Sequence, residues 1–219
     1  MINFENVSKK YGDLIVLDSV DLTIKEGEFT FLTGRSGAGK TTLLRLILKE
    51  ESPDTGKITL DGEDISKVPT KKLPQVRRKV GFVFQDFKLM ENKNVYQNVS
   101  VALDIIGKKD SQIKKLVPEL LQMVGIESKI NKYPWQLSGG EKQRLSIARA
   151  VALEPKVIVA DEPTGNLDQA TSWGIMNLLS TINSEKNTTI VVATHDMEIV
   201  NNLKKRIIKL EEGRVISDK

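Results

Sequence analysis

Residues Gly34 to Thr41 (GRSGAGKT) have the types and spacing that bind a row of phosphate groups. The glycines allow successive backbone amides to point at phosphate oxygens, while Lys40 adds a positive charge and the Thr41 hydroxyl is a ligand for Mg²⁺. The other predicted contacts of this loop are Gly34, Arg35, Ser36, Gly37, Ala38, Gly39 and Thr42. A glycine-rich turn can be purely structural, but the lysine and threonine at its end favour a nucleotide site.

Two adjacent carboxylates, Asp161 and Glu162, follow the apolar run Val157 to Ala160. Such a run predicts a short buried strand, and ligands of α/β proteins bind beyond the carboxyl ends of strands. Carboxylates at this place can simply be solvated, or they can hold a cation and polarise a water molecule.

Gln85 and His195 also come directly after apolar runs, at Val80 to Phe84 and near Thr189 to Ala193. A glutamine can cap a strand, and a lone histidine is most often a structural residue. Their positions at strand ends also suit a ligand site, so the residues alone leave both roles open.

A second glycine-rich segment, Leu137 to Glu141 (LSGGE), precedes the helical run Lys142 to Ala152. Ser138 before two glycines is a good helix cap. The free amides and the dipole at the start of a helix also favour an anion, so this segment can serve structure or ligand binding.

The elements that would position these residues alternate between strands and helices. Strands are predicted at Leu14 to Ile24, Phe29 to Thr33, Gly56 to Leu60, Val80 to Phe84, Val157 to Ala160, Thr189 to Ala193 and Arg206 to Leu210. An extended segment starts at Ile2, a helix follows the phosphate loop over Thr41 to Leu48, and a hairpin turns at Glu212-Gly213. This alternation implies an α/β fold with a mostly parallel sheet.

The stretch between Asn94 and Val124 has a helical pattern instead. Its apolar residues recur at three- and four-residue spacing: Ile113, Leu116, Val117, Leu120, Leu121 and Val124. Pro118 predicts a kink or a later helix start. We therefore expect one 219-residue unit whose core spans about 1–85 and 155–219, with a helical insertion at about 86–154.

Composition excludes several classes of protein. The chain has no cysteine, so disulfides, zinc ribbons and thiol nucleophiles are excluded. We expect no secretory signal and no membrane span, because no apolar run approaches the roughly 18 to 20 residues that a bilayer requires. Work at a membrane would thus need a second chain. The net charge of +4 is modest, so an acidic partner is permitted and not required.

The segment Gln136 to Arg144 (QLSGGEKQR), taken with the phosphate loop, resembles the signature of the ATP-binding cassette (ABC) family, and the resemblance runs essentially end to end. It implies a P-loop NTPase (RecA-like) core, an antiparallel β subdomain and an inserted α-helical subdomain. It also implies an ATPase that uses ATP and Mg²⁺. Arg35 departs from relatives, which often carry an uncharged residue there.

The resemblance assigns catalytic roles to Glu162, as general base, and to His195, Gln85 and Lys40. It makes Thr41, Gln85 and Asp161 the magnesium ligands. Tyr11 resembles the family aromatic that stacks on adenine, although aromatics in early strands are usually core.

Further roles belong to the interface between two copies. Ser138, Gly139 and Gly140 are similar to the residues that face the nucleotide of the other subunit, which implies a homodimer in the ATP-bound state. Asp168 ends a Gly165 to Asp168 segment that resembles the D-loop at that interface.

Phe84 to Leu89 and Asn94 to Gly107 resemble the FtsE family, which acts with the membrane protein FtsX in bacterial cell division. That resemblance implies an FtsX-like integral membrane partner, indirect control of peptidoglycan hydrolases, and a position on the cytoplasmic face of the cell membrane at the division site. Ala160 to Asp168 (ADEPTGNLD) is shared more widely, with lipoprotein-releasing and macrolide or peptide export ATPases, so transport is the alternative.

A DNA- or ribosome-associated ABC ATPase is the alternative from another class, since the chain is basic. This chain, however, has no long heptad insertion between the two parts of its core and no second cassette, so we expect no nucleic-acid partner.

Overall fold

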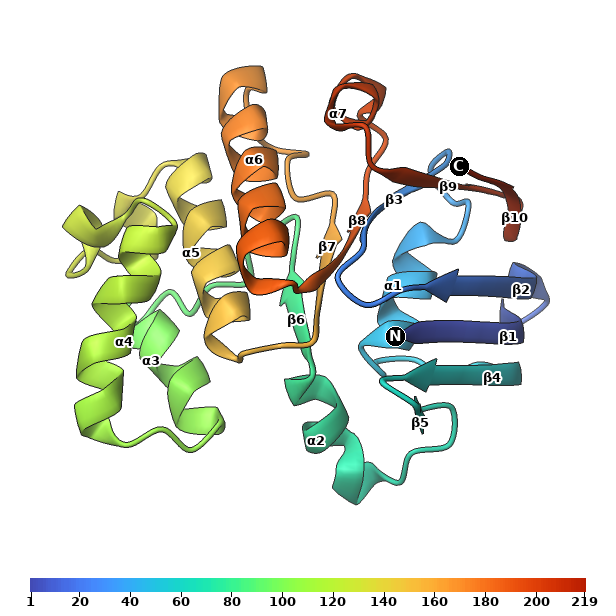
Figure 1. Ribbon diagram of the computed structural model, residues 1–219, viewed down its shortest axis with the longest axis horizontal. Coiled ribbons are helices and arrows are strands. Elements are labelled where there is room, and N and C mark those ends of the chain that lie inside the picture. Colours follow the sequence, from blue (N-terminus) through green and yellow to red (C-terminus); the bar gives the residue numbers. More distant parts are fainter.

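The computed structural model describes residues 1–219 and contains two sheets (Figure 1). The larger sheet has six strands, in the spatial order β10 (Arg214–Asp218), β9 (Arg206–Glu211), β3 (Phe29–Thr33), β8 (Thr189–Ala193), β7 (Val157–Asp161) and β6 (Val80–Val83). All neighbours are parallel except β9 and β10. The prediction of a mostly parallel α/β sheet is confirmed.

The smaller sheet is antiparallel. Its order is β2 (Leu14–Ile24), β1 (Ile2–Tyr11), β4 (Thr55–Leu60) and β5 (Glu63–Asp64). The turn between β4 and β5 is Asp61-Gly62, where φ is 54° and 77°. Two central residues with positive φ are typical of the type I′ hairpin turn, whose twist suits antiparallel strands. This sheet is the antiparallel β part that the family resemblance implied.

Seven α-helices accompany the sheets. They are α1 (Lys40–Ile47), α2 (Leu73–Arg78), α3 (Val95–Ile105), α4 (Asp110–Met123), α5 (Gly139–Ala152), α6 (Gln169–Lys186) and α7 (Met197–Leu203). Short 3₁₀ turns lie at Thr70–Lys72, Glu127–Lys129 and Pro134–Gln136. Helices α3, α4 and α5 all fall between β6 and β7 in the sequence, and they lie together on the left of Figure 1.

The helical stretch differs in detail from its prediction. Gly107, with φ of 82°, separates α3 from α4, so Asn94 to Val124 forms two helices. The helix α4 runs through Pro118, and the alternative of a later helix start is wrong. The helical run assigned to Lys142 to Ala152 begins at Gly139, and Ser138 caps it, as its place before two glycines indicated. Helices α2, α6 and α7 had not been predicted.

The parallel sheet is buried on both faces by two separate clusters of apolar side chains. Alternate residues of β7 illustrate this, since Ile158 and Ala160 belong to one cluster while Val157 and Val159 belong to the other. The first cluster is completed by α3 to α7, and the second by α1 and the antiparallel sheet. Burial of both faces explains the continuous apolar runs of these strands. It also leaves only their ends free for polar side chains.

No helix is long and apolar enough to cross a membrane.

Candidate functional site

The phosphate loop connects β3 to α1. Gly34, Gly37 and Gly39 all have positive φ, of 150°, 80° and 102°, a region that other residues seldom adopt. Lys40 is buried, and its Nζ donates to the carbonyl oxygens of Gly34 at 2.8 Å and Arg35 at 3.3 Å. The ammonium group therefore lies over the loop, with the loop amides at the start of α1. This is the arrangement of a phosphate site.

The outer part of the loop is open to solvent. Arg35, Ser36 and Gly37 are exposed, whereas Ala38 and Gly39 are buried against the β1–β2 hairpin. A Cβ added at Gly39 would lie 2.7 Å from the Val16 carbonyl oxygen. The Arg35 side chain forms no ion pair, so its charge is free to add positive potential beside the loop.

A contact between Thr41 and Asp161 joins the start of α1 to the end of β7. The Thr41 hydroxyl donates to Asp161 Oδ1 over 3.2 Å. Burial raises the pKa of the Asp161 carboxyl, with Glu162 adding to the rise, although the hydrogen bond from Thr41 opposes it. A partly buried carboxylate beside a hydroxyl fits Mg²⁺, which binds through one or two protein oxygens and keeps waters and phosphate oxygens as its remaining ligands.

Glu162 and His195 meet at the ends of neighbouring strands. The pairing of Asp161 with Ala193 sets β7 and β8 in register, so the residues just beyond them are adjacent. His195 Nδ1 lies 2.9 Å from Glu162 Oε2. The Glu162 side chain is 17% exposed and that of His195 73%. Glu162 also has φ of 45°, a costly conformation for a glutamate and one that concentrates at functional sites.

Gln85 lies two residues past the end of β6, the strand next to β7, and so at the same edge of the sheet as Asp161 and Glu162. β6 pairs with β7, Val83 opposite Ala160. The Gln85 carbonyl oxygen accepts from Asn166 Nδ2 at 3.3 Å, and a Cβ at Gly165 would lie 3.0 Å from Gln85 Nε2. The structure thus joins Gln85 to the Gly165 to Asp168 segment. Asn166 makes this contact; it lies in the segment noted from the sequence, where only Asp168 was named as a site residue.

Tyr11 ends β1, opposite Leu14 in the β1–β2 hairpin. The residue is 41% exposed, and Lys9 Nζ lies 5.3 Å from the centroid of its ring. The same hairpin contacts the phosphate loop through Val16, as described above. An exposed ring on an element that packs against the loop is available for stacking, and the adenine contact of Tyr11 stays a prediction.

Ser138, Gly139 and Gly140 begin α5. Ser138 Oγ accepts from the Glu141 amide, and Glu141 Oε2 accepts from the Ser138 amide at 2.8 Å, which together form a capping box. These residues line a hollow of about 510 Å³ that also includes Asp168, and no phosphate-loop residue lines it. Within one chain, therefore, the signature segment and the phosphate loop do not share a cavity.

Asp168 caps α6. Its carboxylate accepts from the Thr171 amide at 2.9 Å and from the Thr171 hydroxyl at 2.6 Å. These hydrogen bonds hold the pKa of Asp168 below its usual value. Asp168 is therefore held in place where it lines the same hollow as Ser138.

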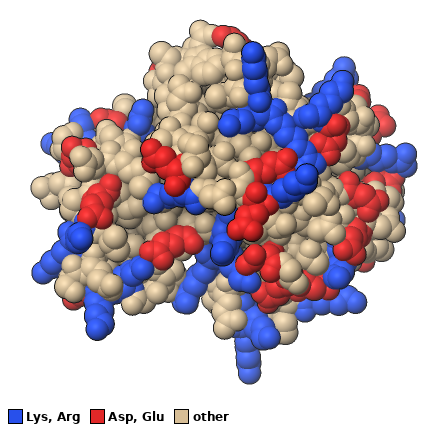
Figure 2. Space-filling view, viewed as in Figure 1, with Lys and Arg blue, Asp and Glu red and all other residues tan.

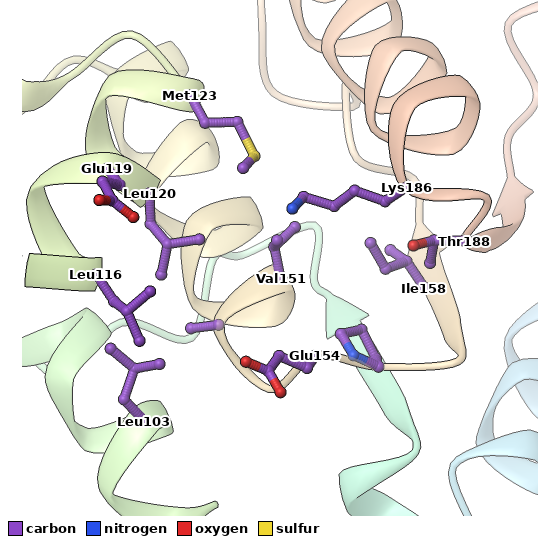
Figure 3. A pocket seen from close by; sticks show the side chains of 12 residues that line it. Leu103, Leu116, Glu119, Leu120, Met123, Val151, Glu154, Ile158, Lys186 and Thr188 are labelled. Carbon is purple, nitrogen blue, oxygen red and sulfur yellow. The ribbon is translucent and has the colours of Figure 1, made fainter. Parts of the chain in front are cut away.

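A separate cavity of about 420 Å³ lies between α4, the end of α5 and the end of α6 (Figure 3). Leu116, Leu120 and Val151 point into it, with Lys186 reaching across from α6. None of the predicted site residues lines this cavity. The candidate site is instead the edge formed by the carboxyl ends of β3, β6, β7 and β8, where the predicted residues lie.

Comparison with known proteins agrees with this geometry. A family model described as ABC transporter matches residues 17–165. The cell division ATP-binding protein FtsE of Bacillus subtilis (strain 168) is 47% identical over 219 residues, which cover 100% of this chain and 96% of FtsE. The methionine import ATP-binding protein MetN 1 of Bacillus thuringiensis is 42% identical over 100% of this chain and 66% of its own length.

A solved structure is also similar to this chain. The ATP-binding cassette MJ0796, in a dimeric post-hydrolysis state bound to ADP and Pi, gives a TM-score of 0.91 at 38% identity, over 100% of this chain and 98% of that one. The chain therefore belongs to the ABC transporter family, and it is an ATPase that binds ATP. Within that family it is of the FtsE type, because its similarity to FtsE spans nearly the whole of both chains.

Lys40→Ala is expected to weaken ATP binding by about 10- to 100-fold, because the role predicted for Lys40 is a charge-assisted hydrogen bond to phosphate. Titration with a fluorescent ATP analogue measures the change. Lys114→Ala is the matched control, since Lys114 is an exposed lysine on α4 that forms no ion pair. Unchanged affinity in Lys40→Ala would contradict the phosphate role of Lys40.

Proposed function

We propose that this chain is the ATP-hydrolysing subunit of an FtsE/FtsX-type complex in bacterial cell division. ATP-driven closure of a homodimer acts on an FtsX-like membrane partner, which in turn controls peptidoglycan hydrolases outside the cell. The chain then resides on the cytoplasmic face of the cell membrane at the division site. The observation that carries this proposal is the match to FtsE over 96% of the FtsE chain, against 66% of MetN 1.

The chemistry follows from the residues at the sheet edge. Glu162 is the general base for the attacking water, and His195, 2.9 Å away, contacts the γ-phosphate. Lys40 and the loop amides hold the phosphates, while Gln85 orients the water. Mg²⁺, held by Thr41, Asp161 and Gln85, supplies charge neutralisation on the phosphate oxygens when bound.

The second copy supplies the signature segment. Ser138, Gly139 and Gly140 open into a hollow that the phosphate loop of their own chain does not reach. A helix start with free amides favours an anion, so the partner's nucleotide is a suitable occupant. The ABC cassettes known as dimers support this arrangement, in which each site needs two chains.

An apolar groove offers a place for the membrane partner. It measures about 360 Å³ and ten of its twelve lining residues are hydrophobic, among them Phe82, Phe84, Met90 and Ile105. Phe84 immediately precedes Gln85, so an occupant of the groove would adjoin the catalytic edge. The partner is an apolar cytosolic segment of the membrane protein, since an apolar groove is matched by apolar side chains.

Ile105→Asp is expected to abolish co-purification of the membrane partner, because it places a charge in the apolar groove. Ile105 is 48% exposed, and Ile216→Asp on β10 is the matched control, as Ile216 is 49% exposed and lies outside the groove. Both variants are checked for ATP binding, which shows that they are folded. Retention of the partner by Ile105→Asp at the level of the control would exclude this groove as the docking site.

The complex itself tests the division role. ATP-trapped Glu162→Gln is purified from detergent-solubilised cells, and the membrane protein that accompanies it is identified. A protein with few spans and a large external domain, together with wall hydrolase factors, supports the division role. Normal septation and wall turnover after depletion of this chain would count against it.

Transport is the second candidate, favoured by the 42% identity to MetN 1. Under this alternative the chain serves an importer, or a lipoprotein-releasing or peptide export system. Stimulation of its ATPase by such a substrate in the presence of the cognate permease would support transport. Nucleic acid is not an expected partner, and Figure 2 shows positive and negative side chains interspersed over the viewed face rather than gathered in one basic patch.

A further inference from the structure

The loop that carries Gln85 contains two consecutive residues in a conformation that side chains disfavour. Phe87 has φ of 62° and Lys88 has φ of 46°. Neither is glycine, asparagine or aspartate, the residues that tolerate this region best. Such backbone persists only where the surrounding structure holds it, and it concentrates at functional sites.

Arg149, on α5, supplies what holds this loop. Its Nη1 donates to the Lys88 carbonyl oxygen at 2.7 Å, and its Nη2 donates to the Phe87 carbonyl oxygen at 3.1 Å. The planar guanidinium thus spans the two left-handed residues with two fixed donors, a geometry that a lysine does not reproduce. Both bonds cross about sixty residues of sequence.

The charge of Arg149 has no other partner. Arg149 forms no ion pair, although Lys88 pairs with Asp86 at 2.6 Å in the same loop. Burial lowers the pKa of the Arg149 guanidinium, which nevertheless stays charged at neutral pH. A partly buried cation without a carboxylate depends on the carbonyl oxygens that accept its hydrogen bonds. Because the donor is charged, these hydrogen bonds are strong, and they hold the loop as well as the guanidinium in place.

The helix α5 is itself fixed against β6. A Cβ added at Gly81 of β6 would lie 2.9 Å from the Ala150 carbonyl oxygen, so the strand and the helix are in close contact next to Arg149. Gln85 comes two residues after β6. The loop is therefore tied to the core at its start through β6, and to α5 at Phe87 and Lys88 through Arg149.

We propose that Arg149 is a positioning residue for ATP hydrolysis, which sets the conformation of the Gln85 loop and acts on the reaction through Gln85. The guanidinium touches neither the phosphate loop nor the Glu162–His195 pair. It also lines the apolar groove, so the same residue adjoins both the loop and the proposed docking site. The proposal rests on the role proposed for Gln85, and it does not require a membrane partner.

A double-mutant cycle on the full isolated chain tests it, with steady-state ATP hydrolysis as the readout. Arg149→Met is expected to lower kcat about tenfold with KM for ATP unchanged, because misplacement of a catalytic group costs rate more than binding. In a Gln85→Ala background, Arg149→Met is expected to produce no further loss. This non-additivity is the sign that Arg149 acts through Gln85.

Arg144→Met is the matched control. Arg144 lies on the same helix and donates to a backbone carbonyl, that of Val124, at 2.7 Å, but it does not touch the Gln85 loop. Its effect on kcat is expected to multiply with that of Gln85→Ala. Arg149→Lys keeps the charge, and it is expected to show the same non-additivity with a smaller loss, which preserves the test if Arg149→Met does not fold.

Two results would overturn the proposal in distinguishable ways. If Arg149→Met and Gln85→Ala each lower kcat and their effects multiply, Arg149 acts by another route while the role of Gln85 stands. If Gln85→Ala leaves kcat unchanged, the proposed role of Gln85 is wrong and the positioning role of Arg149 falls with it.

Discussion

Glu162→Gln is expected to bind ATP and to hydrolyse it at least about a hundredfold more slowly than the unaltered chain, since a general base typically contributes that much or more. The amide of glutamine has the same size as the carboxylate and can keep a polar contact to His195, whose Nδ1 lies 2.9 Å from Glu162 Oε2 in the unaltered chain. It cannot accept the proton of the attacking water. It also removes a negative charge next to the γ-phosphate, so the ATP-bound dimer should accumulate.

Two measurements check this expectation. Phosphate release under saturating ATP gives kcat, and gel filtration with and without ATP gives the fraction of dimer. Glu185→Gln is the control, because Glu185 is an exposed glutamate on α6 away from the sheet edge. Hydrolysis by Glu162→Gln at the rate of the control would remove Glu162 from the base role. Loss of activity without a dimer would instead contradict ATP-driven closure.

Ser138→Arg is expected to leave ATP binding by the single chain intact and to reduce hydrolysis by a factor on the order of 10² or more. A long cationic side chain at position 138 would cover the backbone amides at the start of α5, which face the hollow that Asp168 also lines. The variant also loses its helix cap, at about 1 kcal/mol, which is small against the stability of a domain of this size.

The control for Ser138→Arg is Ser184→Arg, which introduces the same side chain at an exposed position of α6 whose hydroxyl bonds only to its own helix. ATP affinity, hydrolysis rate and dimer content are compared between the two variants. Mixing the Ser138→Arg and Lys40→Ala variants adds a further readout. The first variant has an intact phosphate loop and the second an intact signature segment, so a mixed dimer contains one complete site. Recovered activity would show that the site is shared by two chains. Normal hydrolysis by Ser138→Arg alone would exclude the two-chain site.

Much of the fold was predictable because its signals are local. The runs at Phe29 to Thr33 and Val157 to Ala160 are apolar throughout, since both faces of the parallel sheet are buried, and the Asp61-Gly62 turn follows from residues that accept positive φ. Helices α2, α6 and α7 were missed. The helices α2 and α7 are only six and seven residues long, and α6 has a weak apolar periodicity.

The helical stretch was predicted in kind and not in its boundaries. Pro118 marks a helix break by propensity, yet α4 continues through it, because Val117 and Leu121 on either side are fully buried and packing outweighs the cost. The start of α5 agrees with the cap that Ser138 was expected to form, and the Ser138–Glu141 capping box fixes it at Gly139.

The sequence by itself determined which groups are available for chemistry: the loop from Gly34 to Thr41, the two carboxylates, Gln85, His195 and the LSGGE segment. These are motifs in which neighbouring residues act together, so their order in the chain specifies them. Only the tertiary structure decided their arrangement. The register of β7 with β8 sets Glu162 2.9 Å from His195, whereas the signature segment lies apart from the phosphate loop of its own chain.

The contacts of Arg149 and Asn166 were likewise decided only by the tertiary structure. Each side chain donates to backbone carbonyl oxygens of the Gln85 loop, more than sixty residues away in the chain. Every residue except the last carries such a carbonyl, so no residue type or spacing marks the acceptor in the sequence. The position of these acceptors depends on how α5 and β6 pack, and packing between distant segments is settled only when the whole chain has folded.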